Sequence, residues 1–236
     1  MAIWQVLNNP VDIYCERLDA SFWSEPLNAL SNAAFPLVAL LIWRVMRARG
    51  PISGMNTVLT GLCALIGLGS FLFHTFANRW SEWADTVPIW GFVGLYIYAA
   101  LTTDRGKSRR YKVIAAMLIS SVTLTVLFLM ATGETTDANA ADPLNGTGQY
   151  APALIALLIF AAASWRLRLP QAPWVLAAAV TFLASMAFRT FDMALCTSWP
   201  TGTHFMWHIL NAAMIGFLLM ARGMVRPAVR PATSAR

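Results

Sequence analysis

The sequence contains few charged residues, few cysteines and few histidines. The low content of charged residues restricts the fold classes that the chain can adopt. Only 12% of its 236 residues are charged, whereas 58% are hydrophobic, and the mean hydropathy is +0.57. A soluble domain of this length does not carry so many long apolar runs, so we exclude a soluble fold. The chain also lacks internal repeats, and we treat it as one domain. Its first residues lack a basic stretch followed by a long apolar one, so we expect no cleavable signal peptide.

Seven apolar runs are long enough, or nearly so, to cross a membrane as helices. They cover residues 27–46, 56–77, 83–103, 113–132, 150–165, 173–194 and 204–221. The sequence therefore predicts an all-α integral membrane protein, a seven-transmembrane helix bundle within residues 1–222. Residues 223–236 form a basic tail that we expect to be disordered.

Charged residues are sorted between the two sides of this predicted topology. Every basic residue except Arg17, Arg79 and Arg189 falls in a segment that follows the first, third, fifth or seventh run. All acidic residues except Asp104 fall toward the other side. The positive-inside rule then predicts an outer N-terminus and a cytoplasmic C-terminus. The pI of about 9.7 reflects anchoring to anionic lipid, and we expect no nucleic-acid partner.

The three histidines all lie in or beside apolar segments. His204 and His208 are spaced i, i+4 in T-H-F-M-W-H-I-L, which places both imidazoles on one face of a helix. His74 ends the second run and the other two begin the seventh, so the topology brings all three to the outer half of the membrane. Three imidazoles with an open fourth position are typical of catalytic zinc, and we favour this over histidines that only bond between helices.

Two further polar residues accompany the histidines. Asp85 begins the third run, eleven residues after His74, and could exchange a proton with water, orient a histidine, or only cap its helix. Ser70 shares a helical face with His74 and could donate a hydrogen bond to an oxyanion, or only allow close helix contact. We favour a hydrolase in which both assist a zinc-activated water. A serine nucleophile is disfavoured, because zinc would leave no histidine to activate it.

Four carboxylates precede the first run on the outer face. They are Asp12, Glu16, Asp19 and Glu25. Hard oxygen ligands in a flexible segment suit calcium. The alternative is a solvated acidic lead-in to the first helix, and composition alone favours this alternative.

Cysteines and one charged pair complete the polar features of the outer face. Cys15 and Cys196 both fall there, where a disulfide can persist if the compartment is a periplasm or a lumen. Two free thiols are the alternative, and Cys63, in the middle of the second run, is a small apolar filler. Arg189 and Asp192, spaced i, i+3, are expected to pair with each other or with the polar layer that Asn28, Ser31 and Asn32 form along the first run.

At these residues the chain resembles the alkaline ceramidase family, within a wider group of seven-helix hydrolases that includes the adiponectin receptors. The resemblance rests first on C-E followed by E-x-x-N-x-x-S-N, and on G-x-G-S-x-x-x-H with Asp85 eleven residues later. H-F-M-W-H-I-L completes the set. The similarity runs from about Asp12 to Asn211, and the loops contribute little to it.

The resemblance implies a cofactor and a catalytic set. Zinc would bind His74, His204 and His208, with Ser70 and Asp85 as partners of the zinc-bound water. The implied reaction is hydrolysis of the amide bond of ceramides, which gives a sphingoid base and a fatty acid.

The resemblance also implies a calcium site and a disulfide near the N-terminus. Glu16 and Glu25 match the calcium site best, and Cys15 is expected to join the loop before the last helix. The family places its first Asp two residues before the Cys, whereas Asp12 is three before Cys15. The stretch between Glu16 and Glu25 is also shorter here, so Asp12 and Asp19 are poor matches for calcium ligands.

We therefore expect an amidohydrolase that takes ceramide or a related lipid amide from the bilayer. Phe71, Trp90 and Phe205 are candidates to contact the lipid tails. A zinc-stabilised receptor or lipid-binding protein without turnover is the alternative. A proton-relay transporter ranks last, because the cytoplasmic halves of the helices are nearly uniformly apolar. The basic tail, the alanine-rich composition and the lack of a eukaryotic sorting signal favour a bacterial inner-membrane protein with its site toward the periplasm.

Overall fold

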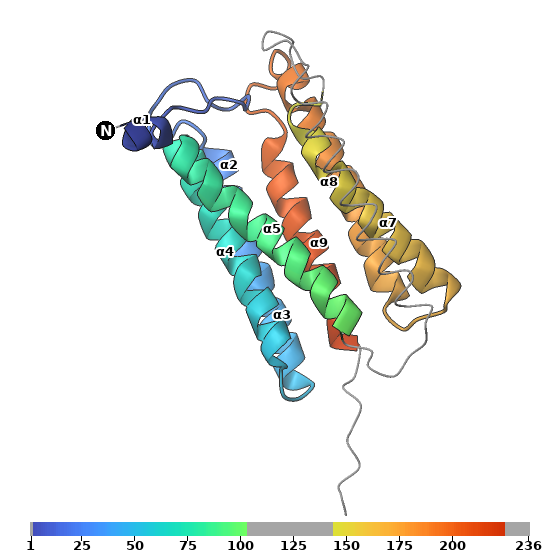
Figure 1. The fold of residues 1–236 in the computed structure, drawn as a ribbon. Coiled ribbons are helices and arrows are strands. Elements are labelled where there is room, and N and C mark those ends of the chain that lie inside the picture. Colours follow the sequence, from blue (N-terminus) through green and yellow to red (C-terminus); the bar gives the residue numbers. More distant parts are fainter. Residues whose placement is uncertain (1, 103–143, 225–236) are drawn as a thin grey trace, which may run out of the picture.

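A computed structural model of the chain describes residues 2–102 and 144–224. Figure 1 shows long helices packed side by side, with α9 in the middle of the bundle. The elements are α1 (Ala2–Leu7), α2 (Pro26–Ser31), α3 (Ala34–Ala48), α4 (Gly54–Phe76), α5 (Arg79–Thr102), the short 3-10 helix η1 (Thr147–Tyr150), α7 (Ala151–Arg166), α8 (Ala172–Leu195) and α9 (His204–Met224). The described residues contain no β-strand, in agreement with the predicted all-α class.

Five helical segments are long and apolar enough to cross a membrane, by length and composition. They are Pro26–Ala48, Gly54–Phe76, Thr147–Arg166, Ala172–Leu195 and His204–Gly223. These segments match five of the seven predicted runs, and they support a multi-pass membrane protein. The third run corresponds to α5, whose 24 residues include Arg79, Glu82 and Asp85 in the first two turns and which is not among the five.

Two sequence-based expectations lie outside the described residues. They are the fourth run, 113–132, and the tail from residue 225 onward. The count of seven spans therefore stays a prediction. Helix α9 continues to Met224, and the predicted boundary between the domain and its tail stays a prediction.

The first predicted run is not one continuous helix, because side chains compete with the backbone near its start. The carbonyl of Asn28 accepts hydrogen bonds from Ser31 Oγ (2.9 Å) and from Asn32 Nδ2 (2.9 Å). The backbone N–H of Asn32 instead donates to the carbonyl of Ala29, three residues back. Such local bonds offer the backbone an alternative to the helical pattern. α2 thus ends at Ser31 as a separate short helix, which contacts both α4 and α9.

Helices α4 and α5 cross with their backbones in close approach at Gly69. A side chain at this position would collide with the carbonyl of Ala84 and approach the Cα of Asp85. Pro88, four residues after Ala84, has no N–H that could bond this carbonyl within the helix. The crossing therefore brings the backbone of Asp85 against α4, one residue from Ser70.

The N-terminal segment crosses the end of the bundle at which α4 ends and α9 begins (Figure 1). The backbone N–H of Val11 donates to the carbonyl of Ala77, directly after α4, at 2.8 Å. Further along, a disulfide joins Cys15 to Cys196, which follows α8, and this confirms the predicted pairing. The segment is thereby fixed across the end of the bundle that carries the histidines.

We expect Gly69→Ala to lower the melting temperature of the detergent-solubilised protein, because its methyl group needs space that the Ala84 backbone occupies. Overpacking of this kind costs about 1–3 kcal/mol. Gly61→Ala in the same helix is the matched control, since a methyl group there meets nothing within 4 Å. Equal melting temperatures for the two variants would contradict the close crossing.

Candidate metal centre

The three histidines meet at the end of the bundle that the N-terminal segment covers. His74 lies in the last turn of α4, and His204 and His208 lie in the first turns of α9, as the sequence predicts. Each imidazole offers one nitrogen, and these three nitrogens lie within 4.8 Å of one another. His74 Nε2 and His208 Nε2 are 3.1 Å apart. All three side chains are almost completely buried.

Hydrogen bonds on the far side of two rings determine which nitrogens carry protons. His74 Nδ1 lies 2.6 Å from the carboxylate of Glu25, which can only accept. His208 Nδ1 lies 2.7 Å from Ser31 Oγ, whose own hydrogen is donated to the carbonyl of Asn28. His74 Nδ1 is therefore a donor, and its Nε2 carries a lone pair in the neutral ring. When His208 donates from Nδ1 to Ser31, its Nε2 carries a lone pair as well.

These histidines fit a bound metal ion. With both rings donating from Nδ1, two nitrogen lone pairs face each other across 3.1 Å, and a cation between them removes their repulsion. Nitrogens bound to one tetrahedral zinc ion, at about 2.0–2.1 Å each, are separated by about 3.3 Å, which is close to the observed distance. His204 adds a buried Nδ1 that has no hydrogen-bond partner among the described residues. A carboxylate behind a histidine, as Glu25 is behind His74, is the usual outer partner of a metal ligand.

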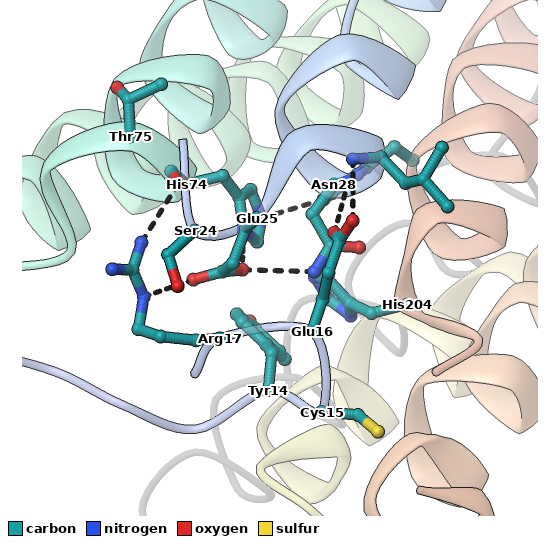
Figure 2. Close-up of polar contacts among 12 residues, drawn as sticks. Tyr14, Cys15, Glu16, Arg17, Ser24, Glu25, Asn28, His74, Thr75 and His204 are labelled. Carbon is teal, nitrogen blue, oxygen red and sulfur yellow. Dashed lines mark hydrogen bonds and ion pairs between the residues drawn. The ribbon is translucent and has the colours of Figure 1, made fainter. Parts of the chain in front are cut away.

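Glu25 also connects the N-terminal segment to α4 (Figure 2). Arg17 Nε lies 2.5 Å from Glu25 Oε1, and Arg17 Nη2 donates to the backbone carbonyl of His74 at 3.0 Å. Burial alone would raise the pKa of the Glu25 carboxyl. Hydrogen bonds from His74 and Asn28, together with the nearby positive charge, outweigh burial and hold this pKa below its ordinary value. Glu25 is thus ionised and favours the Nδ1–H form of His74.

His204 is held from the side by an aromatic ring. The ring of Tyr14 stacks on His204 with centroids 3.7 Å apart and an interplanar angle of 19°. The Tyr14 hydroxyl in turn accepts a hydrogen bond of 2.5 Å from Arg189. The guanidinium of Arg189 lies over three rings, those of Tyr14, Tyr150 and Trp207. Aromatic faces thus surround this buried charge, which forms no salt bridge within the described ranges of the chain.

Asp192 fixes the start of α9, and it does not pair with Arg189. Its carboxylate accepts hydrogen bonds from the backbone N–H groups of Thr203 (2.6 Å), His204 (2.9 Å) and Cys15 (3.0 Å). A negative charge at this place also interacts favourably with the N-terminal end of a helix. Gly202 has a φ of 63°, and a side chain there would collide with Asp192. One buried carboxylate therefore positions the first histidine of α9 and the N-terminal segment together.

The four N-terminal carboxylates do not form one ligand set in the described part of the chain. Glu16 accepts two backbone N–H groups at the start of α2, at 2.7 and 2.8 Å, and burial raises the pKa of its carboxyl. Glu25 faces the guanidinium of Arg17. Asp12 and Asp19 are exposed. These residues do not fit a calcium ion as they stand, and calcium stays a prediction that only the family resemblance carries.

An apolar cavity extends from the histidine group into the bundle between α4, α5, α7 and α9. Its polar lining residues on α4, α5 and α9 include Ser70, Asp85 and His208, which places the two predicted catalytic partners beside one histidine. Mainly apolar side chains line the remainder as far as Ala100 and Leu218. The cavity therefore has a polar end beside the histidines and a long apolar part that extends away from them.

Of the three aromatic residues predicted to contact lipid tails, Trp90 lines this cavity. Phe71 and Phe205 are not among its lining residues. Phe71 instead lies edge-on to Phe22 and Trp23 of the N-terminal segment. Sequence periodicity predicts that a residue lies on an apolar face of its helix. It does not distinguish a residue that lines the cavity from one that packs against other side chains.

Sequence reasoning did not assign roles to several side chains that support the histidines. The sequence does contain a feature that indicates a role for Ser31. This residue lies three positions after Asn28 in an otherwise apolar run, where a polar side chain needs a hydrogen-bond partner. No sequence feature indicates the roles of Arg17 and Tyr14, because both belong to an irregular segment whose path is determined by tertiary contacts.

The fold and the site define a class, a multi-pass helical membrane protein with three buried histidines that can hold a metal ion. A family model described as Ceramidase matches residues 14–229. Because the match covers most of the chain, the chain belongs to the ceramidase family, and the predicted resemblance is confirmed. Membership supports a hydrolase that acts on amide bonds. A comparison with curated proteins finds no match.

We expect Asp192→Asn to weaken metal retention by roughly tenfold, as changes to the partners of ligands often do. The amide leaves a donor facing backbone N–H groups, so the start of α9 and His204 should shift. Metal remaining after titration with a chelator measures the effect. Ser198→Ala is the control, since its hydroxyl bonds only the nearby Leu195 carbonyl in an exposed loop. Unchanged retention in Asp192→Asn would show that His204 is positioned by other contacts.

Proposed function

We propose that the protein is a zinc-dependent intramembrane hydrolase that cleaves the amide bond of ceramide or a related lipid amide. The observation that carries this proposal is the group of three buried histidine nitrogens within 4.8 Å of one another, at the polar end of the apolar cavity. A lipid amide has the matching shape, with a polar amide group at the end of long apolar chains. Membership of the ceramidase family supports the same reaction class.

The proposed ligands are His74, His204 and His208. Zinc bound there would polarise a carbonyl group and lower the pKa of water toward about 7. Glu25 and Ser31 hold the two Nδ1–H groups and so keep each Nε2 available. These hydrogen bonds restrict rotation of the two rings, so the ligands are held ready.

Asp85 and Ser70 are the proposed catalytic residues beside the scissile bond. Asp85 would accept a proton from the attacking water and then donate it to the nitrogen of the leaving amine. Ser70 would donate a hydrogen bond to the carbonyl oxygen as negative charge develops on it. The surrounding apolar side chains exclude bulk water, which strengthens both interactions.

The same proposal includes the placement of the chain in its membrane. Residues 1–222 would form one seven-span hydrolase domain, with a basic tail over residues 223–236. Basic segments on the cytoplasmic side would leave the N-terminus, the disulfide and the histidines toward the outer face. A bacterial inner membrane with the site toward the periplasm suits the Cys15–Cys196 disulfide, because that compartment is oxidising.

The first test is metal content, and it separates a metal protein from a bundle in which histidines only pack. We expect about one zinc ion per chain in the purified wild type, and none in a folded variant with His74, His204 and His208 replaced by alanine. Mass spectrometry of the intact protein and elemental analysis provide the measurement. A folded wild type that takes up no zinc, even when zinc is supplied, would remove the proposed mechanism.

The second test separates an enzyme from a zinc-stabilised receptor. Asp85→Asn should reduce hydrolysis of ceramide by at least about a hundredfold, the contribution that a general acid–base group typically makes. The variant should retain its zinc, because Asp85 is not a proposed ligand. Release of fatty acid is the readout. Full activity in the variant would remove the proton-transfer role, and a wild type that binds but never cleaves lipid amides would favour the receptor.

A further inference from the structure

Arg17 is a buried cation in the irregular segment before α2, and all three of its guanidinium nitrogens meet oxygen atoms. Its Nε lies 2.5 Å from Glu25 Oε1, whereas Nη1 and Nη2 donate at 3.0 Å each to the backbone carbonyls of Asp19 and His74. Only 8% of the surface of Arg17 is exposed. Figure 2 shows its guanidinium directed at Glu25 and at the end of α4. One side chain thus connects its own segment, the residue before α2 and the helix that carries His74.

The oxygen atoms around Arg17 are of the kinds that calcium binds. A carboxylate and two backbone carbonyls are hard oxygen ligands. Here all of them accept from one guanidinium, which carries a permanent positive charge and matches a carboxylate in shape. The Glu25 carboxylate is 2% exposed, and a charge buried so deeply requires an opposite charge beside it. Among residues 2–102 and 144–224, Arg17 is the only lysine or arginine that forms a salt bridge with Glu25.

Two other carboxylates of the segment are also bound by donors of the protein itself. Glu16 accepts the backbone N–H groups of Leu27 and Asn28 at 2.7 and 2.8 Å. The carboxylate of Asp19 accepts the N–H and the hydroxyl of Ser21 at 2.9 and 2.6 Å. A calcium ion would have to compete with these donors as well as with Arg17.

We propose that the Arg17 guanidinium replaces the calcium ion that the family resemblance implies, so that the protein fixes its N-terminal segment and holds its histidine metal without calcium. Arg17 acts through Glu25, whose other oxygen lies 2.6 Å from His74 Nδ1, and it is therefore a positioning residue. A divalent cation at the same oxygens would be repelled by the guanidinium at short range. The inference rests on the proposed function only for the metal at the histidines, and it does not require hydrolysis.

The response of the wild type to calcium is the first test. Calcium-free protein is melted before and after addition of about 5 mM calcium chloride, which exceeds the dissociation constants of weak calcium sites. Magnesium chloride at the same concentration controls for ionic strength. We expect equal melting temperatures with both salts, and no binding of radioactive calcium in equilibrium dialysis. One bound calcium ion per chain, or a melting temperature that rises with calcium alone, would overturn the proposal.

Replacement of Arg17 is the second test. Arg17→Gln should lower the melting temperature by roughly 10 °C, because the buried Glu25 carboxylate loses its cation. Arg79→Gln is the matched control, since it removes an exposed Arg–Glu pair and should lower the melting temperature by less than about 2 °C. Arg17→Lys keeps the charge but not the fork of donors, so its melting temperature should lie between those of wild type and Arg17→Gln. Equal melting temperatures for wild type and Arg17→Gln would overturn the proposal.

The metal at the histidines reports whether Arg17 acts through Glu25. Cobalt(II) in place of zinc absorbs visible light, and its spectrum depends on the geometry of its ligands. We expect Arg17→Gln to change this spectrum and to weaken metal retention by about tenfold, because Glu25 and His74 can then shift. Arg79→Gln should keep the wild-type spectrum. A lower melting temperature of Arg17→Gln with an unchanged spectrum would overturn the positioning role.

The calcium measurements keep this inference separate from the proposed function. They need neither zinc nor turnover, so a wild type without zinc or activity would refute the hydrolase and leave the replacement of calcium by Arg17 standing. They also use only the wild type, and they therefore decide the question even if Arg17→Gln does not fold.

Discussion

The structure depends on two imidazole nitrogens, of His74 and His208, that lie 3.1 Å apart inside an apolar bundle. This spacing is close to that of two ligands on one metal ion, and each ring is hydrogen-bonded on its other side. Glu25 and Ser31 provide those bonds, and both belong to the short stretch around α2. The shape of this stretch, with its early helix end, is therefore as important to the site as the histidines themselves.

Negative and positive charges around the histidines are each matched locally. Glu25 faces a guanidinium and an imidazole, Asp192 faces three backbone N–H groups, and Arg189 faces aromatic rings. Charges buried in this manner are stabilised by several short contacts and not by bulk water. The polar layer is confined to one end of the bundle, whereas the cavity beyond it is lined mainly by apolar side chains. This separation gives the site one polar and one apolar half, as an amphiphilic ligand requires.

The sequence predicted the features that arise from local pattern. Apolar runs located the long helices, and the i, i+4 spacing placed His204 and His208 on one face. The sides assigned to the loops brought Cys15 and Cys196 together. Features that arise from competition between contacts were not predictable. The early end of α2 depends on which group the Asn28 carbonyl accepts, and Asp192 binds the start of a helix to which it does not belong. An i, i+3 spacing suggested a pair with Arg189, but backbone N–H groups were the stronger partners.

The Cys15–Cys196 disulfide and the hydrogen bond from the Cys15 N–H to Asp192 connect residues that lie 181 and 177 positions apart in the chain. During synthesis the N-terminal segment is made first, but its partners after α8 and at the start of α9 are made nearly last. The histidine group can therefore assemble only after almost the whole chain has been translated and inserted. In a truncated or stalled product the N-terminal segment would lack these two attachments, so only the completely synthesised protein would be able to take up the metal.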